Sequence, residues 1–455
     1  MSSLCRPILI AVIAALSILR SGDLAAQEPL PDYVIEAFGQ PPDVPEGPIS
    51  TELEDALRVV FVDSLEFSLW GPPQVAALER IAQSGDPRLV WPITDMMRFT
   101  WRQEFDQALG DAAEALLELE FRGPDRWGRL TNHMIAWDIP AYPRYLDTKR
   151  AIFTHFVPGW DRLFVEGDID WRLVSWGGVL IDDRPFDQTD LSCNCIPAAD
   201  NPPATSAEEA TWLDDDAIVF GIEINGEARA YPRQIMEVRE MVNDTLGGRD
   251  LGIPYCTLCG AAQAYFTDAL PPGVARPVLR TSGLLSRSNK VMYDITTYSV
   301  FDTFLGQAVT GPLGEIGLQL EKATVITTDW GTWKAEYPHT TVLEERLALG
   351  RNFDFRNGRD AFGPIFPVGD VDPRLPVQED VIGVITASGT PVAFPRAASL
   401  LALRDGAEIR FENIRLELDA GGIRAVGIDG EDLGSHEAFW FAWSQFHPGT
   451  ALWTP

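Results

Sequence analysis

The residues best suited to chemistry are two cysteines separated by two residues, Cys256 and Cys259, followed directly by Gly260. A Cys-x-x-Cys-Gly segment supports a disulfide, a thiol redox couple or half of a metal site. In a redox couple, Cys256 would attack as the thiolate and Cys259 would resolve the mixed disulfide. The sequence predicts this pair as the catalytic or metal-binding residues and leaves the choice between these chemistries open.

A second cysteine pair, Cys193 and Cys195, could complete a four-sulfur tetrahedral site with the first pair. The thioether of Met292 would suit copper(I) better than zinc, because soft sulfur ligands select copper(I). Zinc, copper and iron are therefore the expected metals. Structural disulfides are the alternative, although loops as short as Cys-x-Cys and Cys-x-x-Cys gain little stability from a cross-link.

Polar residues in the neighbouring segments are expected to surround the sulfurs. A cation such as Arg239 would lower a thiol pKa, and the other side chains would donate or accept hydrogen bonds. The expected set is Arg239, Asn243, Asp244, Ser282, Asn289, Tyr293 and Asp294. For Ser282, Asn289, Tyr293 and Asp294, the alternative is that the side chains only make the hydrogen bonds of turns.

The elements that position Cys256 and Cys259 are expected to be strands. After Cys259, the small and aromatic side chains of Ala262, Ala264 and Phe266 alternate with the period of a strand. The motif is therefore predicted at a turn between two strands, which excludes a thioredoxin fold, where it would open a long helix. Short alternating runs broken by Gly, Pro, Asn and Asp predict a mainly-β domain over 169–455.

Two similar stretches predict an internal duplication of this domain. The stretch 221–233 has a counterpart at 383–396, and each is expected to form a hairpin. Two tryptophan pairs also match, with the same offsets to a later Pro and Thr, and are expected one helical turn apart in the core. These pairs are Trp330 with Trp333 and Trp440 with Trp443. We expect two related β-rich units, about 171–345 and 375–455.

Helices are expected before this domain, at 50–168, so the predicted fold class is α+β. Residues 27–49 are rich in proline and predict a disordered leader. Residues 1–26 have the charged, apolar and small-residue zones of a signal peptide, with cleavage expected after Ala26. We therefore expect a periplasmic or secreted protein that has no transmembrane segment after cleavage and keeps an even number of cysteines.

The charge of the chain argues against one class of partner. A formal net charge of -31 makes nucleic acid an unlikely partner, because phosphate binding needs clustered Lys and Arg. An envelope protein or a redox partner is compatible with this surface.

Several segments in a fixed order resemble the bacterial family of domain of unknown function 3179. They include 228–232, 242–248, 255–260 and 279–294, within a resemblance that runs from 176 to 448. Some family members carry selenocysteine in the Cys-x-x-Cys motif, so the resemblance implies redox or soft-metal chemistry at this pair. Two departures stand out. Arg239 replaces the family's usual His, and Cys193 and Cys195 look like additions that could replace that His.

We therefore predict an exported protein whose Cys-x-x-Cys site binds a soft or borderline metal or acts in thiol redox chemistry. Whether it is an enzyme stays open. The alternative is a non-catalytic interaction protein of the cell envelope, in which the cysteines form structural disulfides that only cross-link loops.

Overall fold

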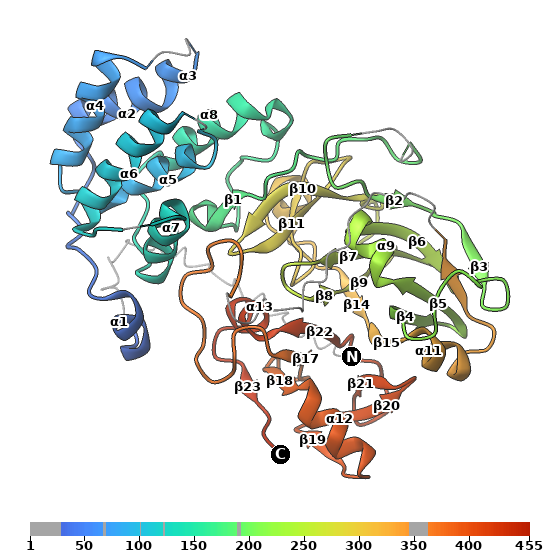
Figure 1. Cartoon of the computed structure of the whole chain (residues 1–455). Helices are drawn as coiled ribbons and strands as arrows, with labels where there is room; N and C mark the ends of the chain where they lie inside the picture. Colours follow the sequence, from blue (N-terminus) through green and yellow to red (C-terminus); the bar gives the residue numbers. More distant parts are fainter. Residues whose placement is uncertain (1–28, 67–69, 101, 122, 189–192, 345–362) are drawn as a thin grey trace, which may run out of the picture.

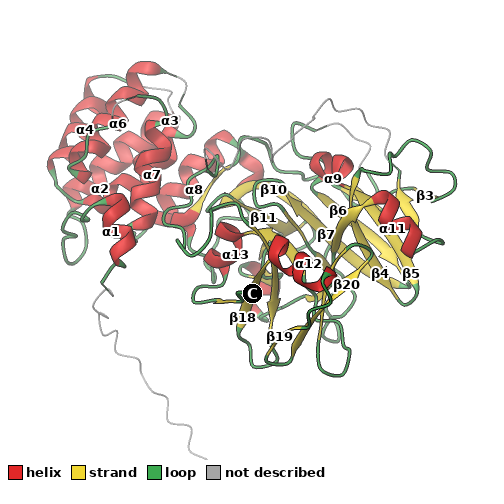
Figure 2. Cartoon of the chain, turned by 60° about the horizontal axis from the view of Figure 1, so that its bottom comes forward, coloured by secondary structure: helices red, strands yellow, loops and turns green. Residues whose placement is uncertain are grey.

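The computed structural model describes residues 29–66, 70–100, 102–121, 123–188, 193–344 and 363–455. The predicted signal peptide at 1–26 lies outside the described residues. Helices gather at one end of the molecule and strands fill the other (Figure 1), and Figure 2 shows the same division by type of element. The α+β class is thereby confirmed, with a helical part followed by a mainly-β part. No helix in the described ranges is long and apolar enough to cross a membrane.

The N-terminal helices begin and end at signals visible in the sequence. The Ser50 side chain accepts a hydrogen bond from the Leu53 backbone N–H at 3.3 Å, and two prolines open the fourth helix. The helices before the first strand are α1 (Asp32–Phe38), α2 (Thr51–Arg58), α3 (Ser64–Glu66), α4 (Pro72–Gln83), α5 (Val90–Met97), α6 (Gln103–Leu117), α7 (Arg126–Ala136) and α8 (Tyr145–Phe156).

The leader expected to be disordered at 27–49 differs from the structure, because α1 lies within it. Val34 of α1 is buried, and the Tyr33 hydroxyl donates to an Asp370 carboxylate oxygen at 3.0 Å. Further along, the Trp137 indole donates to the Gly39 carbonyl at 3.0 Å. These contacts come from residues far along the chain, so proline content alone could not reveal them.

The strands form five sheets in the described residues, arranged in a propeller-like ring. The first sheet contains, in spatial order, β1 (Val174–Trp176), β10 (Leu279–Ser286), β11 (Asn289–Asp294), β12 (Val300–Asp302) and β13 (Gln307–Ala308). The second contains β14 (Glu321–Ala323), β9 (Ala264–Phe266), β7 (Arg249–Cys256), β6 (Met241–Leu246) and β2 (Ala199–Asp200), with β8 (Ala261–Ala262) paired to β7.

The third and fourth sheets have the same arrangement of four strands: three antiparallel neighbours and then one parallel strand. The third is β15 (Ile326–Asp329), β4 (Ile218–Ile224), β5 (Glu227–Pro232) and β16 (Thr341–Leu343), extended by β3 (Ala204–Ser206). The fourth is β22 (His436–Phe439), β17 (Asp380–Ile385), β18 (Pro391–Pro395) and β23 (Ala451–Leu452). The fifth is β19 (Ile409–Phe411), β20 (Ile414–Asp419) and β21 (Gly422–Val426).

Helices connect the strands of these sheets. They are α9 (Arg233–Arg239), α10 (Gly311–Glu315), α11 (Trp330–Glu336), α12 (Arg396–Arg404) and α13 (Trp440–Phe446). Both expected hairpins form, as β4–β5 and β17–β18. Both tryptophan pairs are fully buried, each on one short helix. The Trp333 and Trp443 indoles each donate to a threonine hydroxyl seven residues later, at 2.9 Å in both cases.

The helical part and the first sheet share one hydrophobic core. Apolar side chains of β10 and β11, among them Leu284 and Val291, belong to the same buried cluster as the helices. The Trp160 indole also donates to the Ser282 carbonyl at 2.7 Å. The helices therefore hold the β10–β11 hairpin in place, and this hairpin forms part of the site described next.

Candidate functional site

Cys256 and Cys259 lie at the turn between β7 and β8, as the alternating pattern after Cys259 predicts. Cys256 is paired with Ala261 across this turn, and the Cys259 backbone N–H donates to the Cys256 carbonyl at 3.3 Å. The two sulfurs are joined as a disulfide. Gly260 closes the turn with a φ of +62°, and a Cβ there would lie 2.9 Å from the Phe439 ring. Both the backbone conformation and the close ring require glycine at this position.

The two cysteines differ in what surrounds them. Cys259 is fully buried, and its backbone carbonyl accepts from the Phe439 N–H at 2.8 Å. Cys256 is 3% exposed but lines a cavity of about 370 Å³. The outer cysteine therefore faces an open space while its partner lies behind it in the core. This is the arrangement in which one sulfur can meet a reactant and the other can resolve the product.

The polar part of the cavity wall contains an ion pair that the sequence did not single out. Glu240 and Lys290 both line the cavity, and the Lys290 ammonium is paired with the Glu240 carboxylate. The Thr257 hydroxyl, next to Cys256 in sequence, donates to the same carboxylate at 3.4 Å. Both members of the pair are poorly exposed, at 6% for the lysine side chain and 15% for the glutamate. A buried and mutually neutralised pair therefore lies on the wall that carries Cys256.

Glu240 reaches this position through an unusual backbone conformation. It follows the last residue of α9 in the left-handed region, with a φ of +49°, which costs energy for a residue other than glycine. Its N–H donates to the Met236 carbonyl at 2.7 Å, and its carbonyl accepts from the Tyr255 N–H at 3.0 Å. The α9 terminus and the end of β7 are thereby tied together, which fixes the carboxylate near the cysteine turn.

The second cysteine pair, Cys193 and Cys195, is also joined as a disulfide. Asp182 lies beside it, and the three side chains are close enough that their ligand atoms could hold one metal ion. Asp182 already has partners, however. Its carboxylate accepts from the Arg184 guanidinium at 2.7 Å through each oxygen and from the Ala198 N–H at 2.8 Å. A metal at this group would need reduced thiols and would compete with Arg184.

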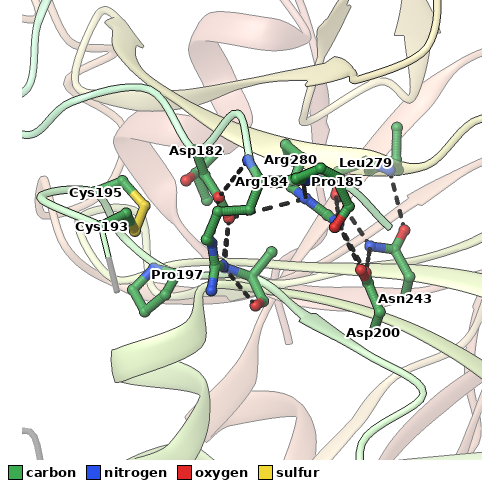
Figure 3. Close-up of polar contacts among 12 residues, drawn as sticks. Asp182, Arg184, Pro185, Cys193, Cys195, Pro197, Asp200, Asn243, Leu279 and Arg280 are labelled. Atoms are coloured by element: carbon green, nitrogen blue, oxygen red, sulfur yellow. Dashed lines mark hydrogen bonds and ion pairs between the residues drawn. A yellow bond between two sulfur atoms is a disulfide. The ribbon is translucent and has the colours of Figure 1, made fainter. Parts of the chain in front are cut away.

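A buried ionic network holds both ends of the loop that carries Cys193 and Cys195 (Figure 3). At one end is the Asp182–Arg184 pair. At the other end, the Arg280 guanidinium donates to both carboxylate oxygens of Asp200, at 2.7 and 2.5 Å, and the side chain of Arg280 is fully buried. The Asn243 amide donates to Asp200 at 2.9 Å and accepts from the Leu279 N–H at 3.0 Å.

The four cysteines form two separate disulfides and their sulfurs do not gather, so the four-sulfur metal site is not assembled. Cys195 forms a β-bridge with Leu180. The residue after Cys195, Ile196, and the residue before Leu180, Val179, line the cavity with Cys256. Because successive side chains of extended chain point to opposite faces, Cys195 is directed away from that cavity. In the described residues, the group of three potential ligands is Asp182, Cys193 and Cys195, without Cys256 or Cys259.

The expected neighbours of the sulfurs have mostly other partners. Arg239 is buried and donates to the Pro197 carbonyl at 3.3 Å, which ties α9 to the Cys193–Cys195 loop. Asn243 belongs to the ionic network. Asp244 accepts from the Arg229 guanidinium at 2.6 Å and from the Tyr231 hydroxyl at 2.7 Å, away from the cavity wall.

The β10–β11 hairpin carries the remaining expected residues. Ser282 lines the cavity, but its hydroxyl donates to the Val291 carbonyl. The Tyr293 hydroxyl donates to the Asp182 carbonyl at 2.7 Å, and the Asp294 carboxylate accepts from the Val278 N–H at 2.8 Å. The Asn289 amide donates to the Arg287 carbonyl at 2.9 Å. These bonds mainly hold turns and strand ends, which agrees with the alternative role expected for these four side chains.

Met292 is fully buried in a separate apolar cluster with Met241 and Tyr265, so it faces neither sulfur pair.

Glu240 and Lys290 were not identified as site residues from the sequence. Each directly follows a residue that was expected at the site, Arg239 and Asn289 respectively. A usable signal was present, because the chain has only four lysines and Lys290 stands directly before the run Val291, Met292 and Tyr293.

A second buried polar cluster lies around the Phe304 ring. His436 and His447 have ring centroids 5.4 and 6.3 Å from it, and the Lys322 ammonium donates to its carbonyl at 3.0 Å. Burial lowers the pKa of Lys322 to about 8 and that of His447 to about 3, and it raises the pKa of Asp302 to about 6. Burial also holds the pKa of His436 well below its ordinary value, so both histidines are neutral in the folded protein near pH 7.

Residues 193–426, just over half of the chain, match the family described as "Protein of unknown function (DUF3179)". This match contains both disulfides and the Glu240–Lys290 pair. Neither a curated protein nor a solved structure matches the chain.

Proposed function

This chain belongs to the DUF3179 family, whose description assigns no activity, and from its site we propose that Cys256 and Cys259 form a thiol–disulfide redox couple. The observation that carries the proposal is the position of Cys256 on the wall of a cavity of about 370 Å³, with its disulfide partner Cys259 buried behind it. A reactant in the cavity would meet one sulfur only.

The chemistry follows from this asymmetry. In the reduced protein, the Cys256 thiolate attacks a sulfur of a disulfide reactant, which breaks that S–S bond, forms a mixed disulfide and releases one thiolate. The Cys259 thiolate then attacks the Cys256 sulfur, re-forms the bond between the two cysteines and releases the second thiolate. Two electrons pass to the reactant, and the released thiolates take up two protons. The reverse sequence oxidises a dithiol.

The surroundings of Cys256 support a reactive thiolate. Lys290 shares the cavity wall, and a nearby cation favours the thiolate over the thiol. Glu240 holds the lysine and offsets part of that effect. A disulfide across so short a loop also contributes little to stability, which argues against a purely structural purpose.

The test is equilibration of the purified protein with dithiothreitol or glutathione buffers, followed by alkylation and mass spectrometry of the two cysteine segments. We expect the Cys256–Cys259 bond to open with a midpoint between about -270 and -120 mV, the range of known Cys-x-x-Cys oxidoreductases. In the reduced protein, we expect Cys256 to react with iodoacetamide at least about tenfold faster than Cys259, because Cys259 is fully buried.

The matched control is the double variant Cys193→Ser/Cys195→Ser, which should keep the midpoint of the Cys256–Cys259 pair. A midpoint below about -300 mV, typical of structural disulfides, would contradict the proposal. So would equal alkylation rates for the two sulfurs.

A metal site at Asp182, Cys193 and Cys195 is the second candidate, supported by the closeness of their ligand atoms. Two thiolates and a carboxylate suit zinc, whereas copper(I) or iron would need a softer or larger ligand set. The test is a zinc titration of the reduced protein: loss of binding in Cys193→Ser/Cys195→Ser but not in Cys256→Ser/Cys259→Ser supports this site. The opposite pattern would assign the metal to the Cys-x-x-Cys pair.

Export to the periplasm or the outside is part of the same proposal, since disulfides persist in oxidising compartments. Its reaction partner would then be a redox partner of the cell envelope.

We also propose that the domain arose by duplication of a unit with the strand arrangement of the third and fourth sheets. The matched indole–threonine bonds of Trp333 and Trp443 support this origin.

A further inference from the structure

The cavity beside Cys256 is mostly hydrocarbon. Its wall includes Val179, Ile196, Leu258, Leu284, Val291 and Phe366. Its volume of about 370 Å³ falls at the small end of the range for ligand sites, which are typically apolar with a few placed polar groups. The occupant is therefore expected to be a small molecule with an apolar body.

Charge restricts the occupant further. The Glu240 carboxylate and the Lys290 ammonium neutralise each other, so the wall offers no unpaired charge from this pair to an ionic ligand. The chain as a whole carries a formal net charge of -31, which repels anions such as glutathione disulfide during encounter. An uncharged molecule is favoured over an anionic one by both effects.

Reactivity supplies the third restriction. A dithiol that becomes a disulfide gives up two electrons and releases two protons, so its reactant must accept the two electrons, and the protons pass to the reactant or to water. A quinone is an uncharged, ring-sized apolar molecule that accepts two electrons and two protons without losing any atom. The Lys290 ammonium lines the same cavity and has three N–H donors, so it can donate a hydrogen bond to a carbonyl oxygen in addition to its bond to Glu240.

Resting on the redox couple proposed above, we infer that this cavity binds a quinone and that the reduced Cys256–Cys259 pair reduces it. The two thiols lose two electrons and two protons, and the S–S bond forms. The quinone gains both, and its two carbonyl oxygens become the hydroxyls of the hydroquinone. A protein dithiol would return the pair to the reduced state by thiol–disulfide exchange.

The experiment mixes pre-reduced, desalted full-length protein with duroquinone under anaerobic conditions. Duroquinone is uncharged, and its ring carbons are fully substituted, so a thiol cannot displace a ring hydrogen. We expect one equivalent of duroquinone to be reduced per protein, with loss of the two thiols of the Cys256–Cys259 pair. Val179 lines the cavity and is half-buried, so Val179→Trp places a large ring at the cavity wall and should lower the second-order rate at least tenfold.

The matched control is Leu401→Trp on α12, where the side chain is 64% exposed, and its rate should equal that of the unmodified protein. Circular dichroism and the melting temperature report whether each variant folds, and Val179→Phe replaces Val179→Trp if the latter does not. Oxidised protein should also gain thermal stability with duroquinone, and Val179→Trp should lose that gain.

A parallel reaction with hydroxyethyl disulfide separates this inference from the proposed redox couple. If the protein reduces hydroxyethyl disulfide but not duroquinone, or if Val179→Trp leaves the duroquinone rate unchanged, the quinone inference is overturned and the redox couple stands. If neither reagent oxidises the pair, both are overturned.

Discussion

Replacement of Arg280 by methionine should destabilise the protein strongly, because it leaves a buried carboxylate without its cation. Arg280 is fully buried and holds both oxygens of Asp200, at 2.7 and 2.5 Å. Removal of one partner from a buried ion pair typically costs about 3–5 kcal/mol. Asp200 would keep its bonds from the Asn243 amide, at 2.9 Å, and from the Asp187 N–H, at 3.1 Å. We therefore expect the lower end of that range, about 3 kcal/mol.

The assay is urea unfolding, followed by tryptophan fluorescence and by circular dichroism. Arg280→Met/Asp200→Leu removes both charges, and it should cost less than Arg280→Met alone, because no uncompensated buried charge remains. Arg410→Met is the control, since Arg410 is paired with Glu408 at the surface and both side chains are about 60% exposed. That change should cost about 1 kcal/mol or less.

The same variant should loosen the loop that Asp182 and Asp200 anchor, so the Cys193–Cys195 disulfide should be reduced faster in Arg280→Met than in Arg410→Met. The reasoning is refuted if Arg280→Met costs less than about 1 kcal/mol, or if the double variant is as destabilised as the sum of its two single variants.

Two further outcomes follow from buried groups elsewhere. Alanine at Gly221 or Gly383 would place a Cβ 2.2 or 2.1 Å from the Trp333 or Trp443 ring, so each should cost about 1–3 kcal/mol in urea unfolding. Gly71→Ala, with no neighbouring atom closer than 3.8 Å, should cost less, and equal costs for all three would contradict the packing argument. Burial holds the pKa of His447 at about 3, so between about pH 6.5 and pH 3 the unfolded chain binds the extra proton and stability falls as the pH falls. In His447→Gln, the free energy of unfolding should therefore fall less between about pH 6.5 and pH 3 than in the unmodified protein. Asp302, whose pKa is raised to about 6, contributes the opposite slope, but it is present in both proteins and does not affect their difference. Identical pH profiles for the two proteins would count against the argument.

Local patterns predicted the elements of the fold well. The two hairpins and the helical spacing of Trp330 and Trp333 are each decided by a few adjacent residues, and these predictions are confirmed. The alternation after Cys259 likewise placed the motif between two strands. These features depend on backbone propensity and periodicity, which a single sequence displays.

Contacts between distant segments could not be predicted in the same way. Within the helical region expected at 50–168, the break between α5 and α6 lies at Phe99, which packs 5.0 Å from the rings of both Phe153 and Trp176. Lys290 meets Glu240 across fifty positions. The prediction that all four cysteines share one metal site was wrong for the same reason. The direction of the Cys195 side chain depends on the pairing of Cys195 with Leu180, which a single sequence does not display.

The bond from the Trp160 indole to the Ser282 carbonyl bears on how this protein can be divided experimentally. A fragment that begins near residue 169 would keep every cysteine of the two disulfides, yet it would leave the apolar side of the β10–β11 hairpin facing water. Such a fragment is expected to be poorly soluble and to lose the shape of the cavity beside Cys256. Expression with the helices attached is therefore a condition for studying its thiols.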